Sequence, residues 1–351
     1  MKSNSLLKYI LTIVITGCLC FDTKGQERFG ELLESGTEDA NALVSGYLSP
    51  ALEAVSVGLG SGWVNTAKTN KSAGFDLTIT ANAIFIPDDE LFYSGTYQNL
   101  TTNPSSSGIT SAPTIFGTDN PEDIPSYTYS YEEEGQQFDG SFDAPEGINL
   151  KDEIGIQAVP IPMAQLGIGI IKNTDIKIRW SPTVDIGDNG EAKLIGFGIM
   201  HDIKQHFRGI KDLPFDLSAF VGFTDVSVEY DLAAELEDTD NVDTANGEAI
   251  FDVNTWSIQG MISKKFSVLT LYGGLGYNIA NAELAMRGNY TVTDDNGNSY
   301  DEVDPVVFET SASGVRATVG FMLKLAILTL HTDYTLQKYN TLTVGVGFSV
   351  R

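Results

Sequence analysis

The chain has 351 residues, a formal net charge of −26 and a sequence pI near 4.2. An acidic balance of this size excludes the basic surface that nucleic-acid binding requires, so we expect no nucleic-acid partner. Both cysteines, Cys18 and Cys20, lie near the start, so the rest of the chain has no disulfide and no thiol nucleophile.

Residues 1–25 have the features of an export signal. Lysines precede an apolar run from Tyr9 to Cys20, and Gly25 stands before Gln26. We therefore predict a signal peptide that is cleaved before Gln26. The stretch Ile15–Cys18 also fits a loose lipoprotein box, so lipidation of Cys18 remains the alternative.

Residues 26–63 form the next segment, for which the sequence predicts helices. Thr37 is placed to cap one helix, with Glu38 in its first turn, and Ser49-Pro50 has the pattern of a second helix start. The glycines from Gly58 to Gly62 would end it. The segment is either a periplasmic lead-in or a small plug that enters a barrel, and we favour the plug.

The first strand is predicted at residues 74–86, where apolar and polar side chains alternate until Pro87. We expect no later apolar run long enough for a membrane helix, whereas a membrane strand needs only about 9–11 residues. Residues 88–151 follow as a long polar connection that includes the acidic run Glu132–Glu134. We expect this connection to be extracellular and to contain strands around residues 92–99 and 127–142.

A hairpin is predicted next, from strands at residues 154–171 and 175–186. Ile176, Ile178 and Trp180 face one side of the second strand, and charged residues, Lys177 and Arg179 among them, face the other. A soluble core would not bury such a row of charges without partners, whereas a water-filled lumen accommodates it.

The remaining chain continues the alternation. Strands are predicted at residues 191–200, 215–230, 251–263, 267–293, 306–323, 327–336 and 341–350, with a basic, helix-like connection at 201–213. The strand at 267–293 is expected to be long, bent and protruding. In the last strand, valine, leucine and phenylalanine alternate with threonine, glycine and serine up to Val350.

The connections between these strands also alternate. Short ones contain lysine, at positions 172, 264–265 and 324, whereas the others are mostly longer and acidic, as at 232–248 and 294–304. Short periplasmic turns and long external loops are typical of outer-membrane barrels.

We therefore predict an all-β fold: an antiparallel transmembrane β-barrel of about 12 strands (10–14) over residues 64–351, with a short N-terminal helical plug-like segment. The expected location is the bacterial outer membrane, and the expected partners are its lipid bilayer and the barrel assembly machinery. A soluble periplasmic β-protein is the weaker alternative.

Six residues on inward-facing positions are the candidate lumen site: Asp76, Lys177, Arg179, Arg316, His331 and Asp333. The three basic residues would either form a constriction that selects anions or pair with inward carboxylates such as Asp76, Asp175 or Asp333. We favour charge pairing.

Catalysis, cofactors and metals are not expected. A serine, His331 and an acid would suit an outer-membrane phospholipase, but the spacing does not support such a site. Asp294, Asn296 and Asn298 match the start of a calcium-binding loop, but its turn glycine and final glutamate are missing. The aspartates from Asp238 to Asp243 match that pattern equally poorly. We expect a solvated acidic surface there.

Three stretches carry a family resemblance: GLGSGW at Gly58–Trp63, GFDLTITANAIFIP from Gly74, and GVGFSVR at the end. Together they resemble uncharacterised outer-membrane barrels of Bacteroidetes that are distantly similar to outer-membrane long-chain fatty-acid transporters. The resemblance implies a barrel with an N-terminal hatch and passive uptake of hydrophobic molecules. The leading hypothesis is thus a channel or transporter for small hydrophobic molecules, gated by its N-terminal segment. The alternative is a structural or adhesive barrel whose acidic loops contact partners.

Overall fold

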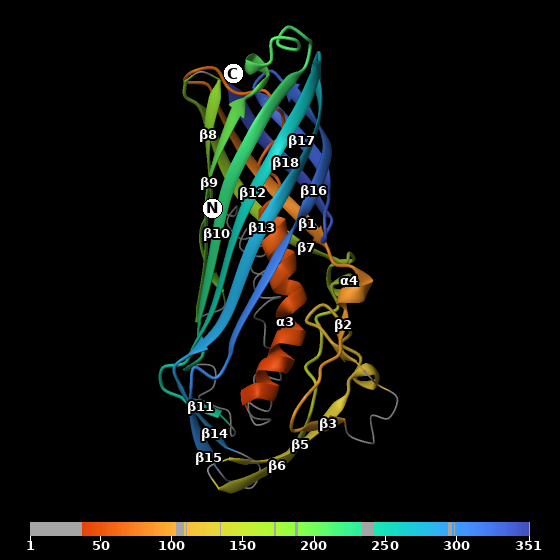
Figure 1. Ribbon diagram of the computed structural model, residues 1–351, viewed down its shortest axis with the longest axis vertical. Helices are drawn as coiled ribbons and strands as arrows, with labels where there is room; N and C mark the ends of the chain where they lie inside the picture. The colour runs from red at the N-terminus through yellow and green to blue at the C-terminus, as the bar shows by residue number, and fades with distance from the viewer. Residues whose placement is uncertain are drawn as a thin grey trace, which may run out of the picture.

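The computed structural model describes residues 37–350 except 103–108, 110, 134, 172, 187–188, 234–241, 294–296 and 298. The predicted signal peptide, the lipoprotein box at Cys18 and the candidate calcium residues Asp294, Asn296 and Asn298 lie outside the described residues. Figure 1 shows one long barrel with helix α3 (Thr37–Leu59) inside it and a group of small sheets at the lower end.

Ten antiparallel strands close the barrel, with β1 paired to both β7 and β18. In order around the wall they are β1 (Phe75–Phe85), β18 (Thr341–Val350), β17 (Leu328–Leu336), β16 (Val307–Leu325), β13 (Leu269–Arg287), β12 (Glu248–Phe266), β10 (Asp216–Asp231), β9 (Gly190–Asp202), β8 (Thr174–Ile186) and β7 (Ala158–Gly169). The wall therefore begins at Phe75 rather than at residue 64.

The ring has ten strands rather than about twelve, because the additional strands expected in the long connections pair only with one another. They form three small sheets: β2 (Phe92–Tyr93) with β4 (Ala112–Pro113); β3 (Leu100–Thr102), β5 (Ser126–Glu133) and β6 (Gln136–Asp143); and β11 (Val242–Thr244), β14 (Asn289–Thr293) and β15 (Ser299–Val303). The predicted single strand at 267–293 is divided into β13 and β14 at Gly288, whose φ of 120° breaks the extended run.

The two ends of the barrel differ. At one end, which we call the short-turn end, lie Phe75, Val350 and the connections 170–173, 203–215, 267–268 and 326–327. The connection at 203–215 contains only a short 3₁₀ turn, Lys204–His206, where a longer helix-like run was expected. At the other end, the long-loop end, lie the connections 86–157, 232–247 and 288–306. Because outer-membrane barrels have short periplasmic turns and long external loops, we expect the long-loop end to be the extracellular one.

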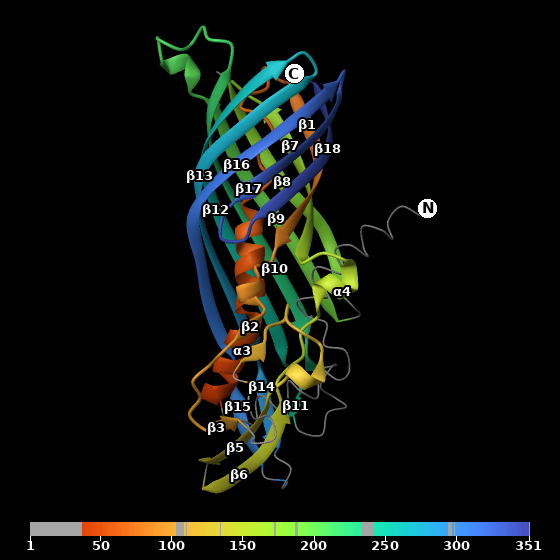
Figure 2. The same ribbon diagram turned by 90° about the vertical axis from the view of Figure 1, so that its right-hand side faces the viewer.

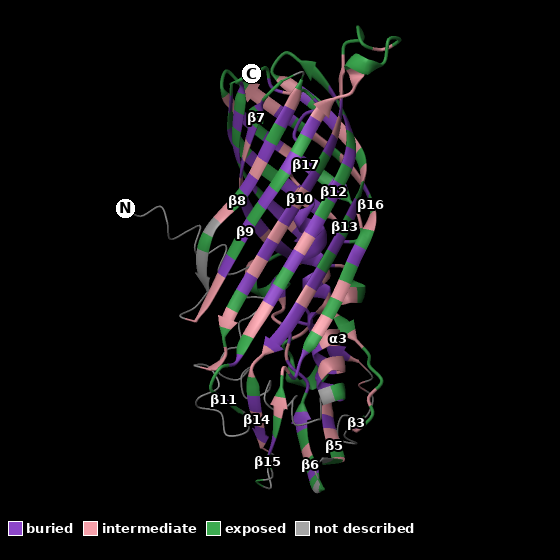
Figure 3. Ribbon diagram, turned by 60° about the vertical axis from the view of Figure 1, so that its left-hand side comes forward, coloured by how far each residue is buried: buried purple, intermediate pink, exposed green. Residues whose placement is uncertain are grey.

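The outer surface changes character partway along the wall. On β12, apolar side chains point outward near the short-turn end and polar ones toward the long-loop end: first Ile262, Ile258 and Trp256, then Asn254 and Asp252. The inward side chains change in the opposite sense, from Gln259 and Ser257 to Val253 and Phe251. Burial still alternates from Phe251 to Lys264 (Figure 3), so the inward and outward faces stay the same and only their polarity is exchanged.

The same exchange occurs on neighbouring strands. The outward side chains change from apolar to polar at one step along each strand. The step lies between Ile195 and Lys193 on β9, Phe223 and Asp225 on β10, Ile279 and Asn281 on β13, and Val315 and Ser313 on β16. Aromatic rings lie near this boundary, as in the pair Phe223–Trp256, whose centroids are 5.0 Å apart. An apolar band bordered by aromatic residues is the lipid-facing surface of an outer-membrane barrel. We call the part of the barrel within the band the membrane zone, and everything beyond it on the long-loop side the head.

Helix α3 is one continuous helix, although two were predicted from Ser49-Pro50. Pro50 lies inside it and leaves the carbonyl of Gly46 without its usual helical donor. The stretch Glu38–Leu59 is long and apolar enough to cross a membrane, which corrects the expectation that no such run follows the leader. However, most of it is buried within the protein. The helix therefore replaces lipid contacts with contacts to the barrel interior.

The head has its own hydrophobic core. Leu43, Leu52 and Val55 of α3 pack in one cluster with Val253 of β12 and Leu284 of β13. Tyrosines and phenylalanines of the connection 86–157 belong to the same cluster. Figure 2 shows α3 extending from the centre of the barrel down into this group of small sheets. The protruding strands thus form a shell that α3 fills.

The orientation can be tested with single cysteines. We expect Ser141→Cys, exposed on β6 in the head, to react with a membrane-impermeant maleimide on intact cells. Arg208→Cys, exposed in the connection 203–215, should react only after the outer membrane is permeabilised. The unsubstituted chain controls for Cys18 and Cys20, and the reverse labelling pattern would invert the assignment of the two ends.

Candidate functional site: the plugged lumen

The lumen of the membrane zone is occupied by the C-terminal end of α3 and by residues 60–74, which we call the lumen segment. The helix enters from the long-loop end, and the lumen segment continues to the short-turn end, where the amide of Ala73 donates to the carbonyl of Gly169. Wall residues bond to the backbone of the last turns of α3: Thr255 donates to the carbonyl of Ser56 at 2.7 Å and Asn82 to that of Gly58 at 3.2 Å. The chain therefore crosses the pore from end to end.

Arg179 holds the end of the helix from one side of the wall. Its guanidinium donates to the carbonyls of Leu59 at 2.9 Å and Ser61 at 3.0 Å, and it lies 3.9 Å from the ring centroid of Trp63. The last carbonyls of a helix lack intrahelical donors and carry partial negative charge, so a cation at this place satisfies them. The side chain is fully buried.

Arg316 binds the chain at the end of α3 from the opposite side of the barrel wall. It lies on β16, which is five positions from β8 in the ring of ten strands. Its Nη1 donates to the carbonyl of Gly60, to Ser257 Oγ at 3.1 Å and to Asn278 Oδ1 at 3.2 Å. Two arginines from opposite walls thus bind the carbonyls of three consecutive residues. Neither forms an ion pair with a carboxylate among the described residues.

Between the arginines and the short-turn end, a small apolar cluster fills the lumen. Trp63 packs against Phe220 with ring centroids 5.3 Å apart, and Met200, Met261 and Met322 complete the cluster from three strands. Gly196, Gly198 and Gly222 face this indole, and a Cβ at any of them would approach the Trp63 ring to within 3.3 Å or less. Glycines on the inner face of β9 and β10 therefore make the space for Trp63.

The remaining charged residues lie near the short-turn end. Lys177 is 3.8 Å from Asp76, and both are buried. Asn70 of the lumen segment joins two carboxylates: its side chain donates to Asp76 at 2.6 Å and its backbone amide to Asp175 at 2.9 Å. Each carboxylate thus accepts bonds from the lumen segment, which ties that segment to β1 and β8.

His331 and Asp333 are buried on the inner face of β17 but do not act together. Asp333 accepts a hydrogen bond from Tyr272 at 2.8 Å, and no hydrogen bond joins it to His331 in the described part of the chain. His331 lies opposite Gly345, and its ring occupies the space where a Cβ of Gly345 would be. Among the described residues, no group of three or more histidine, cysteine, aspartate or glutamate side chains is placed to hold a metal ion.

All six residues predicted for the lumen are on the buried inner face, but they do not form one constriction: five of them belong to three separate groups, and His331 lies against Gly345. Arg179 and Arg316 bind the end of α3, Lys177 and Asp76 belong to the Asn70 network, and Asp333 is bonded to Tyr272. Asn70, Tyr272 and Phe220 are not predicted by any pattern in the sequence. Their partners are distant in the chain, and no local pattern distinguishes them from other inward positions. Trp63 lies in the GLGSGW stretch, which was singled out only for its resemblance.

A closed antiparallel barrel with a lipid-facing apolar band and a polar, chain-filled interior defines this protein as a plugged β-barrel of the bacterial outer membrane. Over residues 1–350 the sequence matches the model of a family of unknown function (DUF6588), and the chain belongs to that family. No curated protein matches it.

Solved structures with a similar fold include three outer-membrane proteins. They are the attachment invasion locus protein Ail of Yersinia pestis (8% identity, 79% of this chain and 99% of that chain, TM-score 0.27), the translocator domain of the autotransporter NalP of Neisseria meningitidis (12%, 88% and 97%, 0.28), and the toluene transporter TodX of Pseudomonas putida (8%, 83% and 96%, 0.27). Similarity at this level carries no argument about function.

Substitution of Arg179 should loosen the plug. Arg179→Met leaves the carbonyls of Leu59 and Ser61 without their donors, so we expect the free energy of unfolding to fall by about 2–4 kcal/mol. Arg179→Lys should restore only part of the lost stability. One ammonium group cannot replace a planar guanidinium that donates to two carbonyls and also stacks on Trp63. The measurement is the denaturation midpoint from heat-modifiable gel mobility. Lys193→Met, on the exposed face of β9, is the matched control, and an equal midpoint for Arg179→Met and this control would contradict the assignment.

Proposed function

We propose that this protein is a structural or adhesive component of the outer membrane, in which a permanently plugged barrel anchors an acidic extracellular head that contacts partners. The observation that supports this is that the two ends of α3 are held in two different parts of the protein. Its C-terminal end is bound by Arg179 and Arg316 in the lumen, while its N-terminal end is bound in the head. There, Asp39 accepts bonds from the amides of Gln98 and Asn99 at 2.8 and 2.7 Å.

The energetics favour a fixed plug. The buried apolar side chains of α3 include Leu43, Val44, Leu48, Leu52, Val55, Val57 and Leu59. Exposing one such side chain costs about 1.5–3 kcal/mol, so withdrawing all of them would cost on the order of 10 kcal/mol or more. That is comparable to the whole stability of a typical domain, about 5–15 kcal/mol. Passive opening by exit of the helix is therefore disfavoured.

The charge of the head indicates the kind of partner. Residues 86–157, the longest extracellular connection, contain 14 acidic residues and a single basic one, Lys151. A surface of one sign accelerates association with partners of opposite charge, and this effect weakens as salt rises. A cationic partner suits this surface.

Gated uptake of a small molecule, which the resemblance to fatty-acid transporters implies, is the second candidate. It is favoured by the polar character of the contacts around the lumen segment, such as those of Asn70 and Ser263, because water can replace them if the segment moves. In this version α3 stays in place and only residues 60–74 move.

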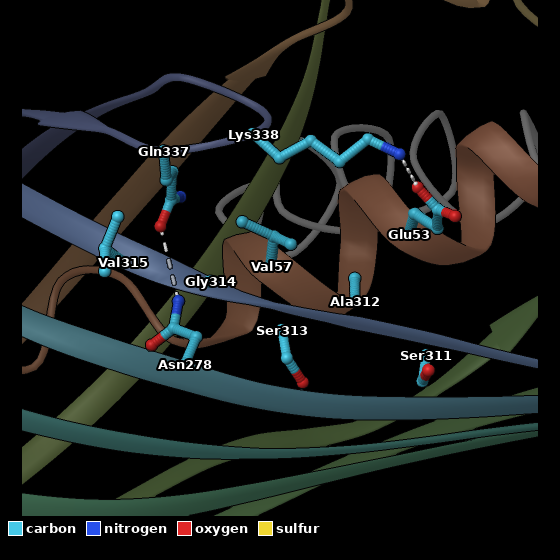
Figure 4. Close-up of a pocket in the computed structure, with 10 residues that line it drawn as sticks. All are labelled: Glu53, Val57, Asn278, Ser311, Ala312, Ser313, Gly314, Val315, Gln337 and Lys338. Atoms are coloured by element: carbon cyan, nitrogen blue, oxygen red, sulfur yellow. Dashed lines mark hydrogen bonds and ion pairs between the residues drawn. The ribbon is translucent and has the colours of Figure 1, made fainter.

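A small cavity lies beside α3 where β16 extends past the short β17–β18 hairpin (Figure 4). It measures about 130 Å³ and is lined by residues that include Val57, Asn278 and Ser313. At its edge Lys338 forms ion pairs with Glu53 of α3 and, at 3.3 Å, with Glu90. These polar groups surround a space that is small for a drug-sized hydrophobic ligand, for which pockets of about 300–1,000 Å³ are usual. Hydrophobic cargo therefore has the weaker support.

A disulfide lock distinguishes the two candidates. Ala67 and Ser263 are adjacent, since the amide of Ala67 donates to Ser263 Oγ at 3.0 Å. We expect Ala67→Cys/Ser263→Cys to cross-link the lumen segment to β12. A permanently plugged barrel predicts no liposome conductance or uptake, with or without the lock. Uptake that is lost on oxidation and restored by reductant would support gating and overturn the fixed plug. The single Ser263→Cys variant is the control.

Binding by the head is tested separately. Asp89, Glu122 and Glu132 are exposed, so Asp89→Asn/Glu122→Gln/Glu132→Gln should leave the fold intact. We expect this triple variant to bind a fluorescent lysine-rich peptide at least about threefold more weakly at low salt, because three charges are lost. Binding is measured by anisotropy with purified protein. Asp212→Asn, exposed at the short-turn end, is the control, and an equal loss in both variants would argue against the head as the binding surface.

A further inference from the structure

A second, larger cavity opens at the short-turn end of the barrel, on the side opposite the head. Its volume is about 430 Å³. It lies between the lumen segment, the end of β12, the start of β10 and the turn between β16 and β17. The lining residues that matter here are Lys68, Lys71, Lys265, Lys324 and Asp216. We call this cavity the basic mouth.

The basic mouth gathers positive charge in a chain of net charge −26. Four lysines from three separate segments line it, with Asp216 as the only acidic residue in the lining. Lys324 donates to the carbonyl and the hydroxyl of Ser349 at 2.9 and 3.1 Å. Lys68, Lys71 and Lys265 form no ion pair with any carboxylate in the described part of the chain. Among the described residues, ion pairs therefore do not neutralise the excess of ammonium groups.

Neutral donors and acceptors complete the lining. Thr66 and Thr69 of the lumen segment and Thr270 of β13, which carry hydroxyl groups, are among the lining residues. Ammonium and hydroxyl groups around one cavity are the donors that a phosphate group accepts bonds from, because its oxygens are charged acceptors. A cation would be repelled, and an apolar molecule would leave these donors unpaired.

The rim of the cavity meets the lipid-facing surface. Ile327 and Val350 line the cavity and are 56% and 48% exposed. Leu325 at the end of β16 and Phe266 at the end of β12 are also exposed. Apolar side chains that border lysines at the end of a membrane strand match the depth of lipid headgroups, with acyl chains on one side and water on the other.

We propose that the basic mouth binds a phosphate-bearing anion at the periplasmic side of the barrel. Two sources share this chemistry: the headgroup of an anionic phospholipid in the adjacent leaflet, and a soluble phosphate or phosphate ester. The position of the rim favours the headgroup. The proposal does not depend on what the head binds or on whether the lumen segment moves.

The test uses the full chain in nanodiscs of mixed phosphatidylglycerol and phosphatidylcholine, with bound lipid counted by native mass spectrometry after extraction. Wild-type protein should retain phosphatidylglycerol in preference to phosphatidylcholine. Lys68→Gln/Lys265→Gln should lower this retention by about tenfold, since each lysine near a lipid phosphate contributes about fivefold at most. Lys211→Gln, exposed in the connection 203–215 at the same end, should retain lipid as wild type does.

Inorganic phosphate provides the second arm, in nanodiscs of phosphatidylcholine alone. A thermal shift with phosphate but not with chloride, lost in Lys68→Gln/Lys265→Gln, would identify a soluble anion as the source. Equal lipid retention by wild type and the double variant, together with no phosphate-specific shift, would overturn the proposal. Heat-modifiable mobility of each variant shows that it is folded, so a loss of binding is not confused with a loss of structure.

Discussion

The structure depends on the hydrogen bonds that Arg179 and Arg316 form with the carbonyls of Leu59, Gly60 and Ser61. A helix that ends inside a barrel leaves its last carbonyls unsatisfied in a place with little water, and a buried guanidinium is equally costly without acceptors. The hydrogen bonds between them satisfy the carbonyls and offset the cost of burying the guanidinium groups. Because the two arginines come from opposite walls, they also fix the helix end at the centre of the ring, and Trp63 and Asn70 then fix the path of the lumen segment.

A second constraint acts on the wall. Strands such as β10, β12, β13 and β16 serve two environments, lipid near the short-turn end and water in the head. These strands suit both lipid and water without a change of register, because apolar and polar side chains exchange faces at the boundary. Beyond it, the inner face is apolar and needs a partner, which α3 supplies. The helix therefore completes the head as well as closing the pore, and this couples the stability of the head to the closure of the lumen.

Much of the fold follows from local pattern. The last strand, Thr341–Val350, has the predicted bounds, and β1 begins and ends within one residue of its prediction. Side-chain alternation has a short period, so each strand carries the signal within itself. The number of strands in the barrel was harder to predict, since alternation at Ser126–Glu133 or Asn289–Thr293 shows that a segment is a strand but not which sheet it joins. The alternation does not predict the exchange of polarity either, because the period remains two on both sides of the boundary.

By itself, the sequence determined that this chain is a β-barrel of the outer membrane type and which charges, from Asp76 to Asp333, point inward, because both follow from periodicity along single strands. Only the tertiary structure decided what those charges do. Arg179 and Arg316 bind a helix end that is more than a hundred residues away in the chain, and Lys68 and Lys265 meet at one mouth. Such pairings depend on closure of the ring and on the direction in which α3 enters it, and neither leaves a local trace in the sequence.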